Sequence, residues 1–426
     1  MKQGNTESYS FPLTQSEDLE QPRDVLTEIL RNGAQDMLRQ AIEDEVARYL
    51  GERSDLVDAD GHRQVIRNGY LPKRKVMTGI GGVEVKQPRV RDRRVGEERE
   101  KFTSSILPPY LRKTKSVEEL LPWLYLKGIS TGDFGEALQA LLGENAKGLS
   151  ATTITRLKGI WENEYKDWSK RSLADKHYVY VWADGIYFNV RLEDPDNSRQ
   201  CILVLMGATS DGKKELIAIN DGYRESAASW KEIMLDCRQR GLGERGGDPR
   251  LAIGDGGLGL WAAIDEVWPS TLHQRCWVHK TANVLNKMPK SLHAKAKSML
   301  HDIWMAETQV EANKAFDLFV ETFKAKYLKA VECLEKDRKP LLTFYRFPAE
   351  HWSHLRTTNP IESTFSTVRL RTDKTKGCGS RTACLTMVFK LVQSAEKHWR
   401  ALNGSTLIPE VIAGVEFVDG LKKDAA

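Results

Sequence analysis

The apolar run at residues 178–190, which reads YVYVWADGIYFNV, constrains the fold most strongly. Its β-branched and aromatic residues are typical of a buried strand, and the run is too short for a core helix. Asp184-Gly185 in its middle predicts a tight turn between this strand and an antiparallel partner. A carboxylate where a buried strand ends is costly unless a hydrogen-bond network or a metal ion compensates it. From this stretch alone, an ordinary turn residue is the simpler interpretation of Asp184.

Two later stretches supply further carboxylates at comparable positions. The segment LAIGDGG puts Asp255 at the carboxyl end of a buried strand, before a glycine-rich turn into a helix. Ligands of open α/β sheets bind at such strand ends. In TTNPIES, Asn359 or Thr358 is expected to cap a helix with Pro360 near its start. Glu362 then lies in the first turn of that helix.

Three convergent carboxylates cannot all be ionised in a cleft without a counter-charge. Asp184, Asp255 and Glu362 would therefore require hard divalent cations, and we expect two Mg²⁺ ions per site, with Mn²⁺ as a substitute. Two such ions can activate water or a 3′-hydroxyl and stabilise the leaving oxygen of an in-line displacement at phosphorus. Spacing alone does not distinguish these three residues from the other acids among the chain's 59.

The composition is that of a globular protein with several domains. The length of 426 residues predicts two to four domains, and no apolar run is long enough to cross a membrane. Residues 1–22 are polar and lack the apolar segment of a secretory signal. Six cysteines without a Cys-x-x-Cys pair fit a reducing cytosol. A net charge of +5 does not by itself indicate nucleic acid, but its distribution does.

An amphipathic helix is predicted near the N-terminus. Apolar residues recur at three- and four-residue spacing from residue 24 to residue 50, and Gly51 ends the pattern. The apolar stripe packs either on a partner subunit or on its own chain, and the pattern does not decide between them.

A basic arm follows this helix. Residues 62–94 contain ten Lys and Arg residues against two acids, Glu84 and Asp92. Short strands joined at Gly81-Gly82 are predicted, and a ribbon of this charge is suited to contact phosphates. A solubility patch is the alternative. The candidate DNA contacts of the arm are Arg67, Lys73, Arg74, Lys86, Arg89 and Arg91.

Three helices are predicted within residues 114–168. Ser116 begins the first, Ser130 or Thr131 the second and Ser150 the third. A glycine-containing turn before the last helix matches a helix-turn-helix, and the adjoining basic arm favours this over a generic three-helix bundle. The candidate DNA contacts of the third helix are Thr152, Thr153, Thr155, Arg156 and Lys158.

The remainder of the chain predicts a mixed α/β sheet covered by helices, interrupted by an all-helical segment. After residues 178–190, strands are expected at 200–212, 214–221, 251–255 and 271–278, and helices at 226–240, 257–268 and 382–402. Residues 278–345 are lysine-rich and carry no strand signal, which indicates an all-α insertion.

Four sequence strings resemble signatures of the IS256/Mutator family of bacterial insertion-sequence transposases. They are YVWADGIY, AIGDGG, HQRCWVHKTANV and LRTTNPIESTFSTVRLRTDKTKG, and LPWLYLKGISTGDF with GLSATTITRL is similar to the family's N-terminal DNA-binding part. The resemblance extends over about residues 25–405. It implies an RNase H-like catalytic domain with an all-α insertion, a DDE triad that binds two metal ions, and binding to terminal inverted repeats. It also suggests a copy-out, paste-in route through a circular intermediate.

Carried over residue by residue, the triad falls on Asp184, Asp255 and Glu362. Gly254 stands where Ser is common in the family, a small change that we do not expect to disturb a metal ligand.

The pair Cys276-x-x-His279 has three interpretations. It is half of a zinc site, for which His351 and His354 would have to come from another element. Alternatively, the family pattern places His279 near the scissile phosphate in a catalytic role while Cys276 packs. The third possibility is a buried pair that holds the sheet to the insertion.

Basic residues surround Glu362. Positions 362, 366 and 369 share one helix face, so Arg369 is expected within reach of DNA held at the acids, although a solvated helix face would show the same composition. The candidate contacts here are Arg356, Arg369, Arg371, Lys374 and Lys376.

The predicted fold class is multidomain α+β, with an RNase H-like mixed α/β catalytic domain, an all-α insertion and a preceding helical DNA-binding region. The predicted parts are a leader (1–22), a helical dimerisation region (23–58), a basic β-ribbon arm (59–112), a helix-turn-helix domain (113–172), the first part of the catalytic domain (173–285), the insertion (286–345), the last part of the catalytic domain (346–410) and a tail (411–426).

We expect a DNA transposase that binds the inverted repeats of its insertion sequence and cleaves and transfers strands. The expected partners are double-stranded DNA, as transposon ends and target, and a second copy of the chain, with no membrane, no small-molecule substrate and no cofactor besides the metal. The expected location is the bacterial cytoplasm, with the nucleoid. The alternatives are an inactive DNA-binding regulator, against which the intact acids count, and an RNase H-like nuclease that cuts without joining.

Overall fold

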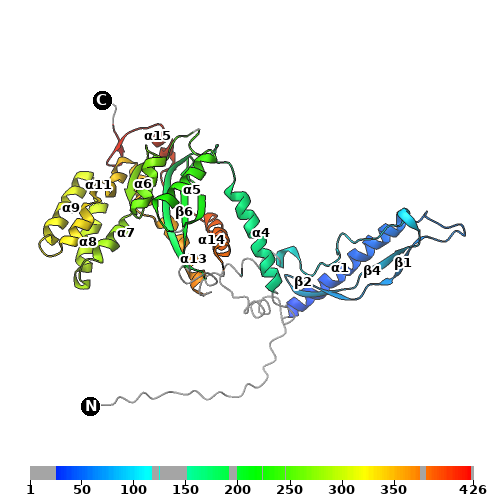
Figure 1. Cartoon of the computed structure of the whole chain (residues 1–426). Coiled ribbons are helices and arrows are strands. Elements are labelled where there is room, and N and C mark those ends of the chain that lie inside the picture. The colour runs from blue at the N-terminus through cyan, green and yellow to red at the C-terminus, as the bar shows by residue number, and fades with distance from the viewer. Residues whose placement is uncertain are drawn as a thin grey trace, which may run out of the picture. The chain divides into compact units, whose positions relative to one another are not determined.

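The computed structural model describes residues 25–117, 124, 151–190, 199–222, 224–244, 246–374 and 380–423. The chain divides into two compact units (Figure 1). The N-terminal unit comprises Met1–Trp123 and Gly132–Gly148, and the C-terminal unit comprises Leu124–Thr131 and Leu149–Ala426. Each unit is described by itself.

In the N-terminal unit, one long helix packs on a β-ribbon. The elements are α1 (Val25–Gly51), β1 (Val65–Tyr70), β2 (Arg74–Thr78), β3 (Gly81–Val85), β4 (Pro88–Asp92) and a 3₁₀ turn, η1 (Gly96–Glu98). β2 pairs antiparallel with β3, and β1 pairs antiparallel with β4. The ribbon is confirmed, but its turn was predicted wrongly at Gly81-Gly82. Thr78 pairs with Gly81, so both glycines belong to β3 and the turn lies two residues earlier, at Gly79-Ile80.

Helix α1 has two apolar faces with different surroundings. Ile42 and Val46 are 1% exposed and pack with residues of β2 and β3, and Leu38 joins them from one turn earlier. The opposite face, earlier in the helix, is a stripe of exposed apolar side chains. Its members are Leu26, Ile29, Leu30 and Met37, which are 51–75% exposed.

The core of the C-terminal unit is a five-stranded sheet in the order β7-β6-β5-β8-β9. Its strands are β5 (Tyr178–Asn189), β6 (Arg199–Thr209), β7 (Lys214–Gly222), β8 (Leu251–Gly254) and β9 (Leu272–Arg275). The first three are antiparallel neighbours, and β8 and β9 are parallel to β5.

The predicted turn at Asp184-Gly185 does not exist. β5 is a single strand of 12 residues, and both residues stay in register with β6, as Asp184↔Val204 and Gly185↔Leu203. An Asp-Gly pair permits a turn but does not require one, and here the cross-strand pairing and the burial of both sheet faces keep the chain extended.

Helices cover both faces of the sheet (Figure 1). One face packs on α5 (Ala227–Gln239) and α6 (Leu258–Val267), through Trp230 and Ile264 among others. The helix predicted from residue 226 begins at Ala227, and Ser226 caps it by accepting a hydrogen bond from Ser229 N. The other face packs on α7 (Trp277–Leu285), α13 (Asn359–Lys374) and α14 (Arg381–Glu396).

The strand predicted at residues 271–278 is too long. β9 ends at Arg275, and Cys276 precedes the first residue of α7, Trp277. The apolar residues Trp277 and Val278 suit either a strand or a helix face, and periodicity over so few positions cannot separate the two.

The segment predicted to be an all-α insertion is helical. It contains α8 (His293–Met305), α9 (Gln309–Phe323), α10 (Leu328–Glu335) and α11 (Arg338–Leu341), and these helices lie on the other side of the sheet from α4 (Figure 1). The chain then continues through α12 (Trp352–Leu355), α13, α14, α15 (Ile408–Ile412) and the short strands β10 (Phe417–Val418) and β11 (Leu421–Lys422).

The third predicted helix before the sheet is present as α4 (Ala151–Ser169). Its later half packs on α14 within the C-terminal unit, where Trp168 and Tyr165 contact the ring of Phe389. The two helices expected before it lie almost entirely outside the described residues, so the helix-turn-helix remains a prediction.

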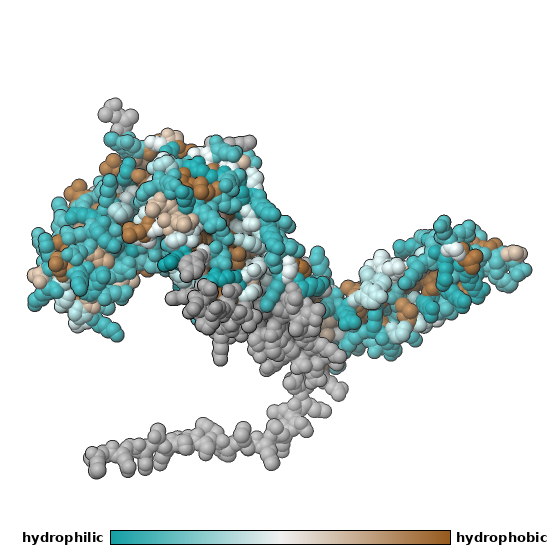
Figure 2. Space-filling view, viewed as in Figure 1, coloured by the Kyte–Doolittle hydropathy of each residue, from teal (hydrophilic) through white to brown (hydrophobic). Residues whose placement is uncertain are grey.

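The face shown in Figure 2 is mainly hydrophilic, with hydrophobic residues in small separate patches. Of the helices that the structure describes, none combines the length and the apolar character needed to cross a membrane.

Candidate active site

The first two predicted acids are brought together by strand register. β5 and β8 are parallel neighbours whose pairing ends at Ala183↔Gly254. Asp184 and Asp255 are the next residue on each strand, so they follow at the same edge of the sheet on strands about 4.8 Å apart. Seventy residues lie between them in the sequence, and the register alone makes them neighbours.

Asp184 is a buried carboxylate whose negative charge has few compensating interactions. Its side chain accepts a hydrogen bond from Gly185 N at 2.9 Å, and the residue is 8% exposed. Within the described residues, no Lys or Arg forms an ion pair with it. Burial raises the pKa of Asp184 to about 7, the charge of Asp255 adds to the rise, and His279 opposes it. The metal-free site thus holds more negative charge than its surroundings accommodate.

The loop after Asp255 is shaped by glycine. Asp255 Oδ1 accepts a hydrogen bond from Gly257 N at 2.8 Å. Gly256 has φ +84°, and a Cβ there would collide with the guanidinium group of Arg275. Arg275 is 4% exposed and pairs with Asp337 at 3.4 Å. The buried arginine therefore fixes the path of the loop that carries Asp255.

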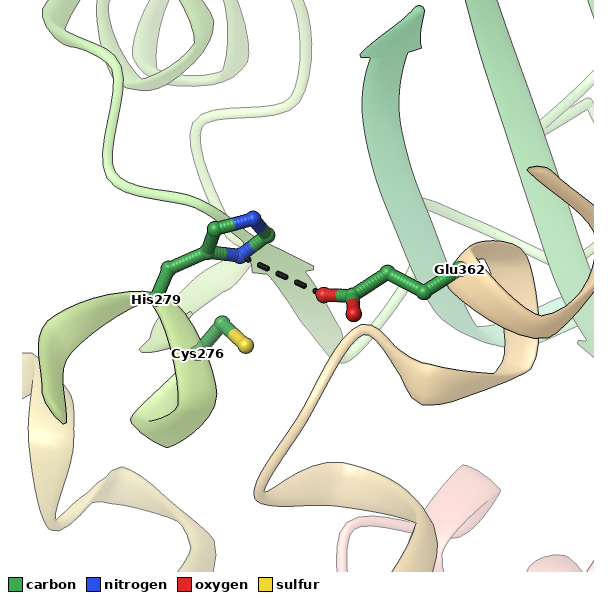
Figure 3. A group of neighbouring side chains, drawn as sticks. All are labelled: Cys276, His279 and Glu362. Carbon is green, nitrogen blue, oxygen red and sulfur yellow. Dashed lines mark ion pairs between the residues drawn. The ribbon is translucent and has the colours of Figure 1, made fainter. Parts of the chain in front are cut away.

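The third predicted acid, Glu362, lies in the first turn of α13, as expected. It points toward His279 in the first turn of α7, with Cys276 beside the imidazole (Figure 3). His279 Nδ1 and Glu362 Oε1 are 3.5 Å apart. The ligand atoms of Cys276, His279 and Glu362 all lie within 4.8 Å of one another.

Thr358 connects these three residues and was not predicted to do so. Its hydroxyl donates to Glu362 Oε1 at 2.7 Å and lies 3.4 Å from His279 Nδ1. Its backbone N–H donates to Cys276 Sγ at 3.3 Å. Thr358 is fully buried. The sequence suggested a helix cap, and Thr358 does accept the backbone hydrogen bond of Glu362, but its side chain serves the carboxylate instead.

Cys276 and His279 shift each other's pKa values in opposite directions. A hydrogen bond that His279 donates to Cys276 Sγ, together with the charges of Cys276, Asp184 and Glu362, raises the pKa of His279 to about 9 against the effect of burial. Burial alone would raise the pKa of Cys276, but hydrogen bonds with His279 and Thr358 lower it overall. The raised pKa favours the imidazolium form of His279 at neutral pH, which places a positive charge beside Glu362.

A fourth acid that sequence reasoning missed, Glu225, lies beside Asp184 and Asp255. Burial raises the pKa of Glu225, and the charge of Asp255 raises it further. Glu225 immediately precedes Ser226, the cap of α5. Its position before a capped helix is the only sequence signal, and many surface acids share it.

Comparisons with known proteins identify the family of the chain. A model of the family described as "Transposase, Mutator family" matches residues 7–401. The chain belongs to the Mutator family of transposases.

Two insertion-sequence transposases show the relationship directly. The chain is 51% identical over 304 residues to the transposase for IS6120 from Mycolicibacterium smegmatis. The matched region covers 71% of this chain and 92% of that protein. It is 52% identical over 286 residues to the transposase for IST2 from Acidithiobacillus ferrooxidans, over 67% of this chain and 95% of that protein. The transposase for IS256 in transposon Tn4001 from Staphylococcus aureus is 25% identical over 377 residues, 88% of this chain and 92% of that protein. The family resemblance inferred from the motifs is confirmed.

The histidines considered for a zinc site in this Mutator-family protein have other partners. His351 is bonded to the Tyr180 hydroxyl at 2.7 Å, and His354 lies 3.2 Å from Lys214 Nζ. Among the described residues, Cys276 and His279 instead acquire Glu362 as a third possible ligand. A soft ion held by this group would compete for the carboxylate of Glu362.

The basic residues of the arm fall into two groups. Four are engaged within the unit: Arg67 pairs with Glu43, Lys73 pairs with Glu84, Arg74 donates to the Leu107 and Pro108 carbonyls, and Lys86 lies over the ring of Tyr70. Arg89 and Arg91 are exposed on one face of β4, and no ion pair with another described residue holds them.

Of the other predicted DNA contacts, the structure describes the side chains of only some. Arg356 is packed against three aromatic rings, with Phe344 at 4.7 Å, and Arg369 is exposed on α13. On α4, Arg156 is exposed and Lys158 is half-buried. The side chains of Thr152, Thr153, Thr155, Arg371 and Lys374, and all of Lys376, lie outside the described residues. All of these DNA contacts remain predictions.

We expect His279 in the metal-free protein to titrate near pH 9, above the ordinary value of about 6.5. The folded state then binds more protons than the unfolded state, so this contribution to stability is complete below pH 6.5 and is lost as the pH rises through 9. Histidine NMR titration measures it, with His279→Gln assigning the signal.

Cys276→Ser should lower this pKa because it removes the largest cause of the shift. Cys237→Ser, which changes a buried cysteine on α5, serves as the control. A His279 signal that titrates near 6.5 in every variant would contradict the prediction.

Proposed function

We propose that this protein is a DNA transposase that uses Asp184, Asp255 and Glu362 to cleave and join strands at the ends of its insertion sequence. The observation that carries the proposal is the register of β5 and β8, which brings the buried carboxylate of Asp184 and the half-buried carboxylate of Asp255 to one edge of the sheet. His279 links them to the third acid, since it interacts with both Asp184 and Glu362.

The catalytic domain proposed here is RNase H-like. Three antiparallel strands followed by two strands parallel to the first, in the order β7-β6-β5-β8-β9, support that assignment. The DDE triad then comes from β5, the end of β8 and α13, with the insertion between the second and third acids.

The acids fit a divalent cation. They offer oxygen ligands, and the uncompensated charge of Asp184 favours a bound cation over an empty site. Asp184, Asp255 and Glu362 would hold Mg²⁺ or Mn²⁺, which would activate the attacking oxygen and stabilise the leaving oxygen at phosphorus. Thr358 fixes the Glu362 carboxylate, and the imidazolium of His279 offers a positive charge to a phosphate bound beside the acids.

Binding to the inverted repeats is proposed for the ribbon and the region before α4. Arg89 and Arg91 are the arm's best candidates for phosphate contacts because their charges are not compensated within the ribbon.

A homodimer formed through α1 is also part of the proposal. The exposed stripe of Leu26, Ile29, Leu30 and Met37 faces away from the side that packs on the ribbon, so a second copy could cover it without disturbing that packing.

The first test uses a labelled duplex that carries the element's end, with Mg²⁺ or with EDTA. Wild type should nick and join the DNA only with metal, and Asp184→Asn, Asp255→Asn and Glu362→Gln should abolish both reactions because each removes a ligand charge. Binding to the end should survive.

Asp302→Asn, on an exposed position of α8, is the matched control. Tight end binding without wild-type chemistry would leave a DNA-binding regulator, and cleavage without joining on any end sequence would leave a nuclease.

The second test addresses the arm. Arg89→Ala and Arg91→Ala should each weaken end binding and reduce the log–log salt slope by about 0.9 per lost phosphate contact. Fluorescence anisotropy over a range of salt concentrations measures the slope. Arg39→Ala, on exposed α1, should leave it unchanged. Unaltered slopes in both ribbon variants would remove the arm from the DNA interface.

The third test addresses the dimer. Leu30→Glu should convert a dimer to a monomer in sedimentation velocity because it buries a charge in the paired stripes. Asn32→Glu, exposed on the same helix but off the stripe, is the control. Measurements with and without the end duplex show whether pairing needs DNA, and a wild type that is monomeric in both states would refute the proposed interface.

A further inference from the structure

Glu225 approaches the acid cluster from the face of the sheet covered by α5 and α6. A Cβ built on Gly185 would lie 2.5 Å from Glu225 Oε1, and all three of its nearest atoms would belong to the Glu225 side chain. Glu225 thus fills the space that a side chain would take at the residue after Asp184.

A second glycine admits the backbone of the same residue. A Cβ on Gly259, in the first turn of α6, would lie 2.8 Å from Glu225 O and 2.7 Å from Ala227 N. The segment before α5 therefore passes between β5 and the helix that follows Asp255. Two close approaches, at Gly185 and at Gly259, place Glu225 beside β5, which carries Asp184, and beside the start of α6, which follows Asp255.

Electrostatics and hydrogen bonding agree with this position. Asp184 and Asp255 both interact with the charge of Glu225. Tyr187, two residues after Gly185 on the same side of β5, hydrogen bonds to Glu225. No ion pair with Lys or Arg compensates Glu225 within the described residues. A purely structural role would not call for a third acid beside two that already repel each other.

We propose that Glu225 is a fourth carboxylate of the divalent-cation site, which binds the metal from the side of the sheet opposite Glu362. This inference rests on the proposed function, because it assumes that Asp184 and Asp255 are metal ligands. It explains why the residue after Asp184 is glycine: a larger residue would displace the carboxylate of Glu225.

The test measures Mn²⁺ binding to the full-length, DNA-free protein by calorimetry and by the shift in melting temperature. Glu225→Gln should weaken Mn²⁺ binding by about 10- to 100-fold. It should also raise the melting temperature of the metal-free protein, because it removes one of several repelling charges. Glu232→Gln, on an exposed position of α5, should behave like wild type.

Gly185→Ala gives a second line of test. Gly185 lacks the positive φ that would strain alanine, so the substitution acts through the Glu225 side chain. It should weaken Mn²⁺ binding as Glu225→Gln does. In a Glu225→Ala background it should have no further effect, because the side chain that it displaces is absent.

Each outcome decides the inference. If Glu225→Gln lowers the metal-free melting temperature and leaves Mn²⁺ affinity unchanged, while Asp184→Asn abolishes binding, Glu225 is structural and only this inference fails. If wild type and Asp184→Asn bind Mn²⁺ equally weakly and no metal-dependent cleavage occurs, the proposed function fails as well.

Discussion

Repulsion between like charges at one edge of the sheet, where Asp184 is buried and Asp255 and Glu225 are half-buried, is the constraint on which the site in the C-terminal unit depends. The parallel register of β5 and β8 forces Asp184 and Asp255 to the same sheet edge, and Glu225 adds a third negative charge from the opposite face. Folding must hold these groups close although each would be better solvated apart. Burial of the hydrophobic core on both faces of the sheet offsets the free-energy cost of this repulsion. A bound cation would reduce the repulsion.

Three backbone hydrogen bonds connect the end of β8 to the segment that carries Glu362. Cys276 N donates to Gly254 O, so the start of α7 is tied to the end of β8. Trp277 N donates to Arg356 O, which ties α7 to the segment before α13, and Glu362 N donates to Thr358 O within that segment. Glu362 is 107 residues beyond Asp255 in the sequence, yet only a few main-chain contacts separate it from the same strand end.

The sequence predicted the elements of this unit better than their junctions. Residues 214–221 and 251–255 were recognised as strands because each contains a short apolar run, LIAI and LAI, and Glu362 was placed correctly because Pro360 marks the start of a helix. Asp184-Gly185 was misread as a turn because the dipeptide carries the turn signal while the cross-strand pairs that override it are not visible in one sequence. Thr358 and Glu225 were missed for a related reason, since their roles depend on side-chain contacts between elements far apart in the chain.

Hydrogen bonds to the helical insertion also hold part of the site in place. Trp277 Nε1 and Gln274 Nε2 both donate to Leu341 O, and the buried Lys280 bonds to Cys333 O at 2.7 Å. These bonds hold the end of β9 and the first turns of α7, the segment that presents Cys276 and His279. A helical segment between the second and third acids thus braces the strand end and helix start that carry Cys276 and His279.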